Sequence, residues 1–237
     1  GCVPLKEDGN LKSVRIFGHT YKGKGLYEVL ESYVRKGFYA MDSKEKERGK
    51  DIMWYIWLSE NSPLFGKGKM ATFERYFLAE KETHKEKKNP YYLLLEDEKV
   101  ICHILKEFGL ENKDAHIING HVPVKCKDGE KPIKCDGKVL VIDGGFSRAY
   151  QKETGIAGYT LIYNSYGLIL AAHEPFESTE AAIEKESDIH SDSTVVKRTL
   201  ERKKVEDTDV GRDLKEQIAD LEVLLAAYRS GVIAERL

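Results

Sequence analysis

A run of strand-forming residues ends abruptly within residues 114–123, DAHIINGHVP. Ile117-Ile118 is typical of a strand, and Asn119-Gly120 marks the turn that follows it. Because glycine carries no Cβ, we expect the backbone to bend at Gly120 and the imidazole of His121 to project from the carboxyl end of the strand. α/β proteins usually bind ligands at that edge of the sheet, and neutral imidazole is a common ligand of transition metals. The stretch therefore predicts an α/β fold with a candidate metal ligand at His121, although a Gly-His pair alone is weak support for a metal site.

After this stretch, the hydrophobic residues keep the period of two that is typical of strands. Apolar runs predict strands at residues 139–142, 160–163 and 168–170. The intervening residues 164–167, NSYG, predict a hairpin turn between the last two strands. Near the amino terminus, residues 14–17 predict a further strand or hairpin arm.

Helical periodicity dominates residues 20–113. Residues 26–34 and 97–108 each place apolar side chains on one face, and Gly109 is a typical helix stop. Residues 43–58 begin with charged side chains and end in an apolar run, IMWYIWL, which we expect to be buried because it is apolar almost all round.

The last part of the chain is polar and highly charged. Residues 177–209 predict a long surface excursion, in which residues 193–204 form a short helix. An amphipathic helix is predicted over residues 209–228, with Gly231 as its stop.

The composition is that of an ordinary soluble globular protein, with 237 residues, 41% hydrophobic and 33% charged residues, and a net charge of −2. So small a net charge produces no electrostatic field that would attract the protein to nucleic acid or to an anionic membrane. No apolar run approaches the ~20 residues that span a bilayer, and no signal peptide opens the chain. We therefore expect a cytoplasmic protein with no nucleic-acid or membrane partner.

The four cysteines lack the paired short spacing of a zinc site. Cys126 and Cys135 could face each other across a hairpin, but free thiols in a reducing cytosol are the favoured interpretation. The chain begins with Gly1-Cys2-Val3-Pro4 and has no initiator Met, so we expect it to be part of a longer polypeptide.

Several polar residues near the predicted strand ends are candidates for a site. Asp143 follows a strand and precedes two glycines, so it is either a partner that orients a metal-bound histidine or a turn-forming residue that binds its own backbone. Arg148 and Lys152 could bind a phosphate, because a guanidinium and an ammonium together suit a phosphorylated metabolite, or they could simply be solvated.

Residues 61–77 contain two glycines, two lysines and an arginine but do not match a P-loop, because no strand precedes them and Gly-Lys-Ser/Thr is absent. They form either a phosphate-facing loop or a connection whose aromatic side chains pack inward. Among the other histidines, His103 lies near the apolar face of a predicted helix, so we expect it to pack in the core rather than bind a ligand. His116 could line a site, and His173, at a strand end, is a weak second candidate.

Long stretches of this sequence resemble the class III fructose-1,6-bisphosphatases of bacteria. The resemblance is carried by WYIWLSENSPLFGKGKMATFERYF at residues 54–77, ETHKEKKNPYY at 82–92, INGHVPVK at 118–125 and the run 137–176, GKVLVIDGGFSRAYQKETGIAGYTLIYNSYGLILAAHEPF. It covers nearly the whole chain and is much more specific than a Gly-His pair.

The resemblance implies a calcineurin-like metallophosphoesterase fold, in which two sheets lie between helical layers. This chain would be the carboxyl-terminal part of that four-layer α/β/β/α sandwich (fold class α/β, or α+β). Residues 1–19 and 114–176 would belong to the sheet-forming catalytic part, and residues 20–113 would form a mainly helical insertion. Residues 177–237 would be a charged excursion and the carboxyl-terminal helix.

The resemblance also implies a two-metal site, usually manganese, in which His121 matches a metal ligand. Residues 1–4 resemble the sequence that directly follows another metal-binding histidine in a His-Gly-x-x-Pro pattern, and that histidine and the other ligand motifs are absent here. Such metals, ~3.5–4 Å apart, activate a bridging hydroxide for in-line attack on phosphorus. The missing amino-terminal part of the same enzyme would supply the remaining ligands, and Lys125, Arg148 and Lys152 are the candidates for binding the sugar bisphosphate substrate.

Two other interpretations are open. The chain could be a non-catalytic binding or regulatory module that keeps the carboxyl-terminal fold, or it could belong to a metallophosphoesterase that acts on a different phosphate substrate. The resemblance of the helical insertion to the bisphosphatase family alone argues against a different substrate. A half-sandwich would expose apolar sheet surface, so a homo-oligomer is a further possibility.

Overall fold

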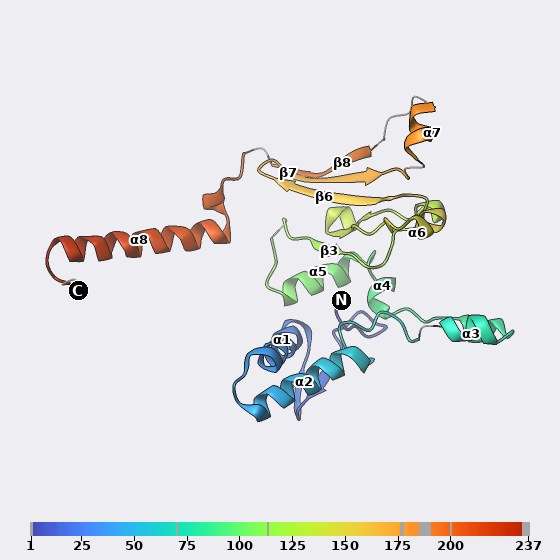
Figure 1. Cartoon of the computed structure of the whole chain (residues 1–237), viewed down its shortest axis with the longest axis horizontal. Coiled ribbons are helices and arrows are strands. Elements are labelled where there is room, and N and C mark those ends of the chain that lie inside the picture. The colour runs from blue at the N-terminus through green and yellow to red at the C-terminus, as the bar shows by residue number, and fades with distance from the viewer. Residues whose placement is uncertain are drawn as a thin grey trace. The chain divides into compact units, whose positions relative to one another are not determined.

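The structure is a computed structural model that describes residues 2–69, 71–112, 114–175, 178–184, 191–199 and 201–233. These residues form two compact units. The first unit comprises Gly1–Val124 and Gly129–Val141, and the second comprises Lys125–Asp128 and Ile142–Leu237. Helices and several small sheets occur together (Figure 1), which confirms the predicted mixture of α and β structure.

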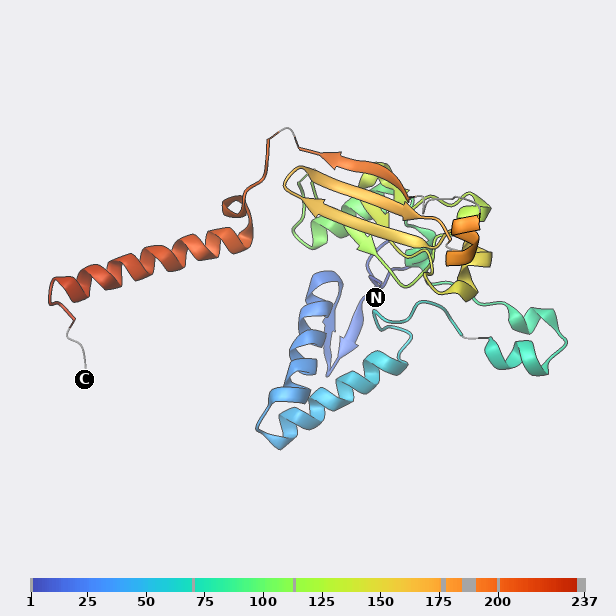
Figure 2. The same ribbon diagram turned by 45° about the horizontal axis from the view of Figure 1, so that its top comes forward.

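The first unit begins with a β-hairpin and two helices that pack together. Strands β1 (Val14–Ile16) and β2 (His19–Tyr21) pair antiparallel, and helices α1 (Gly23–Tyr39) and α2 (Ser43–Leu58) follow them. Figures 1 and 2 show the two helices side by side. Their shared core consists of buried aliphatic side chains from all of these elements except β2, namely Val14, Ile16, Leu26, Leu30 and Ile52.

Helix α2 is a single element that runs from a charged start into the predicted apolar run. The carboxylate of Asp42 caps it by accepting a hydrogen bond of 2.9 Å from the backbone N–H of Glu45. The expectation that residues 52–58 are buried is confirmed for Ile52 but wrong for Trp54 and Trp57, which are 66% and 76% exposed. A helix that packs against one neighbour buries only one stripe, here at Gly49 and Ile52, whatever the composition of its other faces.

The rest of the first unit carries short helices and a small mixed sheet. Helices α3 (Thr72–Phe77), α4 (Pro90–Leu93) and α5 (Glu98–Glu107), with the 3₁₀ helix η1 (Lys81–His84), precede strands β3 (Ile117–Asn119), β4 (Ile133–Lys134) and β5 (Val139–Val141). The sheet has the order β3-β5-β4, with β3 parallel and β4 antiparallel to β5. Gly109 has a φ of 75° directly after the cap of α5, which confirms the predicted helix stop.

His103 lies on the exposed face of α5, so the expectation of a core histidine is wrong. The buried stripe of this helix consists of Val100, Ile101, Ile104 and Leu105. His103 lies between Ile101 and Ile104 in the sequence, and the helical turn of about 100° per residue carries its side chain away from them.

The second unit is built on an antiparallel sheet. Strands β6 (Gly158–Asn164) and β7 (Gly167–His173) form the predicted hairpin, and β8 (Ser191–Arg198) pairs with β7. Figure 2 shows the three strands together. The expectation of a helix over residues 193–204 is wrong. Residues 193–198 belong to β8 and complete the sheet, and the described residues 199 and 201–204 are not helical either. The Ser-Thr-Val-Val run of β8 favours a strand, a preference that the surrounding charges obscure.

Several helices precede, interrupt or follow this sheet along the chain. The 3₁₀ helix η2 (Cys126–Asp128) and helix α6 (Arg148–Thr154) precede β6, and α7 (Thr179–Glu184) lies between β7 and β8. The 3₁₀ helix η4 (Val205–Asp207) leads into α8 (Asp209–Arg229), which confirms the predicted carboxyl-terminal helix. No helix in the described ranges is long and apolar enough to cross a membrane.

The closest approach of α1 and α2 depends on two glycines, and we predict that Gly49→Ala destabilises the first unit. A Cβ on Gly49 would overlap the backbone of Gly37 and lie 2.5 Å from the carbonyl oxygen of Tyr33. Since neither backbone can move without separating the helices, we expect the free energy of unfolding to fall by about 2 kcal/mol. Hydrogen exchange of the α1 and α2 amides, measured by mass spectrometry, would report this loss.

Gly25→Ala provides the matched control, because Gly25 also lies in α1 and a Cβ there would meet nothing within 4 Å. That substitution should raise the free energy of helix opening by up to about 1 kcal/mol, because alanine has a higher helix propensity than glycine. Exchange of the α1 amides should therefore be slightly slower. Equal effects of the two substitutions would contradict the close-packing account.

Candidate functional site

The edge of the first unit's sheet carries the residues that the sequence singles out. Ile117 lies opposite Val139 and Asn119 opposite Val141 in the parallel β3–β5 pair. Since the strands are parallel, their carboxyl ends lie at the same edge, and Gly120-His121 follows β3 there. The side chain of His121 is exposed. The predicted projection of an imidazole from a strand end is therefore confirmed.

The bend at this edge occurs at His121 itself rather than at Gly120. His121 has a φ of 70°, in the left-handed region that few residues other than glycine adopt, whereas Gly120 has no positive φ. A Cβ on Gly120 would meet nothing within 4 Å. The expectation that Gly120 allows the turn is wrong, because the unusual conformation lies on the histidine. Residues held in such conformations cluster at functional sites, which adds a structural reason to single out His121.

A second histidine, His116, lies just before β3. Its Nδ1 is 2.7 Å from the carbonyl oxygen of Gly137, so Nδ1 carries the proton and donates it. Cys135 and Asp136, with φ of 48° and 50°, form the tight turn that presents this carbonyl. Among the described residues, the buried Nε2 of His116 has no hydrogen-bond partner. Nε2 of His116 is therefore buried inside the first unit without a partner among the described residues. The sequence indicated only that His116 could line a site.

His116 lines a cavity of about 280 Å³ together with Asn119, Tyr91 and several apolar side chains of α5 and β3. The hydroxyl of Tyr91 donates a hydrogen bond of 2.9 Å to Oδ1 of Asn119. Burial raises the pKa of Tyr91 to about 12, so this hydroxyl stays protonated at neutral pH. The cavity is thus mainly apolar, with a few polar groups whose positions are set by hydrogen bonds.

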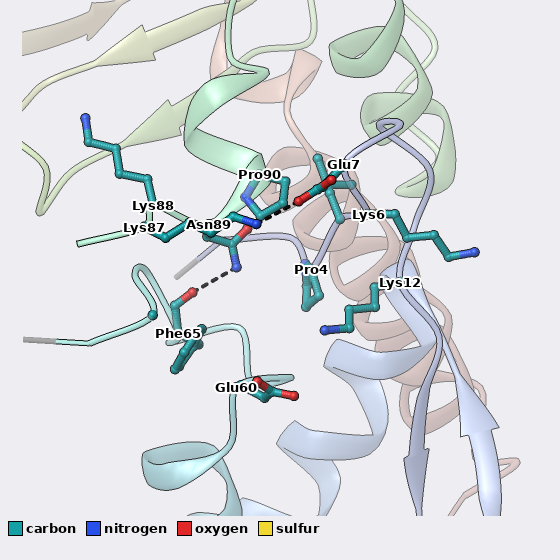
Figure 3. Close-up of a pocket in the computed structure, with 12 residues that line it drawn as sticks. Pro4, Lys6, Glu7, Lys12, Glu60, Phe65, Lys87, Lys88, Asn89 and Pro90 are labelled. Carbon is teal, nitrogen blue, oxygen red and sulfur yellow. Dashed lines mark hydrogen bonds and ion pairs between the residues drawn. The ribbon is translucent and has the colours of Figure 1, made fainter. Parts of the chain in front are cut away.

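A larger hollow of about 360 Å³ lies at the amino-terminal segment and residues 60–90 (Figure 3). Four lysines and two glutamates line it, but Lys87 is paired with Glu7 at 2.7 Å. Lys6 and Lys88 extend away from each other in Figure 3. The lysines therefore do not converge on one point, as they would around a single phosphate.

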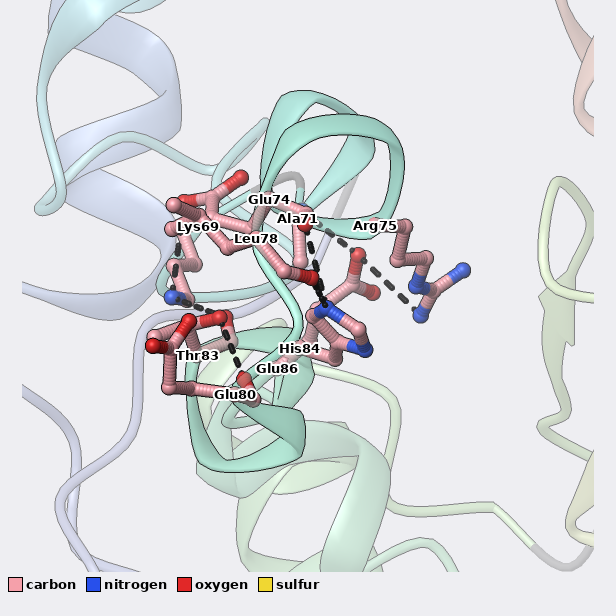
Figure 4. Close-up of polar contacts among 9 residues, drawn as sticks. All are labelled: Lys69, Ala71, Glu74, Arg75, Leu78, Glu80, Thr83, His84 and Glu86. Atoms are coloured by element: carbon pink, nitrogen blue, oxygen red, sulfur yellow. Dashed lines mark hydrogen bonds and ion pairs between the residues drawn. The ribbon is translucent and has the colours of Figure 1, made fainter.

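The alternatives for residues 61–77 are decided by the contacts of their cations. Glu86 accepts hydrogen bonds from Lys67 at 2.6 Å and from the backbone N–H of Ala71 at 2.8 Å, and Arg75 lies 3.7 Å from it. These two hydrogen bonds, that of Lys67 foremost, lower the pKa of Glu86. Lys69 donates to the carbonyl of Thr83 at 2.5 Å (Figure 4). The three cations thus join residues 67–75 to residues 83–86, which argues against a phosphate-facing loop.

The other interpretation of this segment, a connection with inward aromatic side chains, is wrong. Phe73, Tyr76 and Phe77 are 74%, 80% and 78% exposed. Phe73 and Phe77 stack on each other with ring centroids 6.3 Å apart. Helix α3 has only six residues, and none of them is buried.

In the second unit, Asp143 accepts a hydrogen bond of 2.8 Å from the backbone N–H of Gly145. This bond is the one expected of a turn-forming aspartate, and Gly145 has the positive φ of such a turn. A Cβ on Gly144 would lie 2.6 Å from the Cα of Gly158, so the glycine is needed for the turn to approach β6. The turn interpretation of Asp143 is confirmed, and its role toward a metal-bound histidine stays a prediction.

The candidate substrate-binding residues also lie in the second unit. Lys125 and Lys152 are both exposed, and Lys127 donates a hydrogen bond to the carbonyl oxygen of Lys152. This contact joins the segment of Lys125 to α6. Arg148 is the first residue of α6, and its side chain lies outside the described atoms.

His173 ends β7 as predicted, and both of its ring nitrogens are engaged. Nε2 lies 2.7 Å from the hydroxyl of Thr160, and Nδ1 lies 3.0 Å from that of Ser191. These contacts join the three strands of the sheet, so they account for His173 structurally. Among the described residues of the whole chain, no three His, Cys, Asp or Glu side chains form a group that could hold a metal ion.

Comparison with known proteins gives matches over nearly the whole chain. The family model described as Firmicute fructose-1,6-bisphosphatase matches residues 1–230. Proteins named fructose-1,6-bisphosphatase class 3 from Clostridioides difficile and Clostridium acetobutylicum are 59% and 56% identical to the chain over 236 residues. The match covers 99% of this chain and 36% of each relative.

No solved structure matches the chain significantly. The match to the family model covers nearly the whole sequence, including the cation-rich residues 61–77 and the His121 turn. The chain therefore belongs to the Firmicute fructose-1,6-bisphosphatase family.

Proposed function

We propose that this chain is part of an enzyme that hydrolyses fructose 1,6-bisphosphate to fructose 6-phosphate and phosphate, a step of gluconeogenesis. The observation that carries this proposal is the family match over residues 1–230, supported by relatives that are named for this activity. Because the chain spans 36% of the length of those relatives, the activity is proposed for the whole protein and not for the chain alone.

The proposed enzyme is metal-dependent, with two manganese ions. The described residues do not suffice for such a pair, since they contain no group of three potential ligands. His121 can contribute one nitrogen, because it is exposed and follows the carboxyl end of β3. The remaining ligands would come from the part of the relatives' length that this chain does not match.

We also propose that the sheets of this chain form part of a metallophosphoesterase sandwich of α/β/β/α layers. The parallel β3–β5 pair and the antiparallel β6–β7–β8 sheet are the elements that such a sandwich would contain. In that arrangement residues 20–113 are the helical insertion, and residues 1–19 and 114–176 belong to the catalytic part.

Lys125, Arg148 and Lys152 are proposed to bind the sugar bisphosphate. The support for this role is that η2 and α6 are tied together by the hydrogen bond between Lys127 and the carbonyl of Lys152. Two exposed ammonium groups on linked segments suit a substrate that carries two phosphates. Asp143 is proposed as the partner that orients the metal-bound histidine.

The cysteines favour a reducing compartment. All four are free thiols, as the sequence favoured, and Cys2 is buried. Free thiols are usual in the cytoplasm, which is where we place the enzyme.

Joining this chain to the part of the Clostridioides difficile relative that lies outside the match should produce an active phosphatase. We expect manganese-dependent release of phosphate from fructose 1,6-bisphosphate by the joined protein and none by the chain alone. The missing segment would complete a metal site that the described residues cannot form. Phosphate release would be measured with a colorimetric assay.

Dinucleotide and phosphoprotein substrates serve as controls in the same assay. Preferential hydrolysis of either would favour a metallophosphoesterase of different specificity. A folded, metal-loaded hybrid without activity on any of the substrates would instead favour a non-catalytic module.

His121→Ala in the joined protein should weaken manganese binding. Loss of a residue that supports a metal ligand typically reduces metal affinity by about 10–100-fold. Loss of the ligand itself should reduce it by at least as much. Metal content after dialysis reports this directly, and phosphatase activity should fall with it. The matched control is His103→Ala, which removes another exposed imidazole from α5. Normal metal content in His121→Ala would show that His121 is not a ligand.

A further inference from the structure

Helix α8 carries an apolar stripe that the structure leaves uncovered. Leu214, Ile218, Leu221, Leu225 and Tyr228 follow each other at alternating spacings of four and three residues. They are 46%, 55%, 63%, 48% and 43% exposed, respectively. Burial of these side chains against another apolar surface would be favourable, because it removes apolar area from water.

Among the described residues, the contacts that secure this helix lie at its beginning. Thr208 caps α8 by accepting a hydrogen bond of 3.1 Å from the backbone N–H of Gly211. Gly211 is buried, and a Cβ there would collide with the carbonyl group of Val205 in η4. The rest of α8 therefore extends beyond this anchor with its stripe open.

The spacing of the stripe indicates the kind of surface that covers it. Alternating steps of four and three give a mean period of 3.5 residues, which keeps a stripe facing a second helix that winds around the first. A face of period 3.6 has the same spacing over two heptads, and Leu224 lies beside this stripe. The stripe therefore fits another helix, and the charges beside it must indicate which one.

The charges beside the stripe indicate that this second helix is α8 of another copy. Lys215 and Glu222 flank the same side of the stripe, seven residues apart. When two α8 helices run antiparallel, Leu214 of one meets Leu225 of the other, and Lys215 of each lies beside Glu222 of the other. The arrangement is self-complementary, as a two-fold dimer requires. A parallel pair would instead place Glu222 beside Gln217 and form no ion pair.

We propose that two copies of this chain associate through an antiparallel coiled coil of their α8 helices. The helix has 21 residues and a length of about 30 Å, so the seam is short. We expect a reversible dimer with a Kd in about the micromolar range. The antiparallel arrangement also brings the helix termini of opposite partial charge together.

The ion pair that Lys215 makes within the chain does not oppose this association. Lys215 lies 2.9 Å from Glu206, and the two side chains are 60% and 45% exposed. Exposed pairs of this kind contribute little to stability, so Lys215 can turn to Glu222 of the second copy at small cost.

The test is the molar mass of the 237-residue chain by sedimentation equilibrium over a wide range of concentrations. Leu221→Asp places a charge at the centre of the seam and should raise the dimer Kd by about tenfold or more. Val223→Asp is the matched control, because Val223 is 71% exposed on the opposite face of the same helix, and the dimer should be unchanged. Circular dichroism would verify that both variants keep their helix content.

A charge exchange tests the antiparallel orientation. Glu222→Lys alone should weaken the dimer by setting two lysines beside each other, and adding Lys215→Glu should restore it. A chain that is monomeric at every concentration overturns the proposal. So does a dimer that is insensitive to Leu221→Asp, and so does a monomer in which Leu221→Asp lowers thermal stability more than Val223→Asp, since the stripe would then be covered within the chain.

Discussion

The parallel pairing of β3 with β5 is the interaction on which the candidate site depends. Val139 and Leu140 of β5 are completely buried, so the register of the pair is fixed by the core. This register brings the ends of both strands to one edge, where the chain turns through His121. It also places the Gly137 carbonyl, just before β5, beside the imidazole of His116, just before β3. Both histidines of this region thus take their positions from one short strand pair.

The conformation of His121 connects backbone strain to function. A left-handed residue other than glycine costs about 1–2 kcal/mol, and the adjacent Gly120 could have adopted that conformation without this cost. The chain nevertheless places it on the histidine. Such an arrangement is understandable if the direction of the imidazole matters more than the local stability, which is the situation of a metal ligand.

The cations of residues 61–77 show how the same composition can serve packing instead of binding. Lys67 and Arg75 surround Glu86, and Lys69 binds a backbone carbonyl, so they join residues 67–75 to residues 83–86. The aromatic rings of α3 are left exposed by this arrangement. The apolar stripe of α8 is likewise exposed. The aromatic rings of α3 and the stripe of α8 are thus two apolar surfaces that could pack against another surface.

The sequence alone determined the strands around residues 117–170, the helices α1, α5 and α8, the free cysteines and the family, because local periodicity, turn residues and long motifs carry that information. It located His121 at a strand end but attributed the bend to Gly120. Only the tertiary structure decided which faces are buried. Trp54, Trp57 and His103 are exposed because each helix buries only one of its faces, and residues 191–198 form a strand because β7 offers a free edge. Those outcomes depend on partners distant in the chain, which no local pattern encodes.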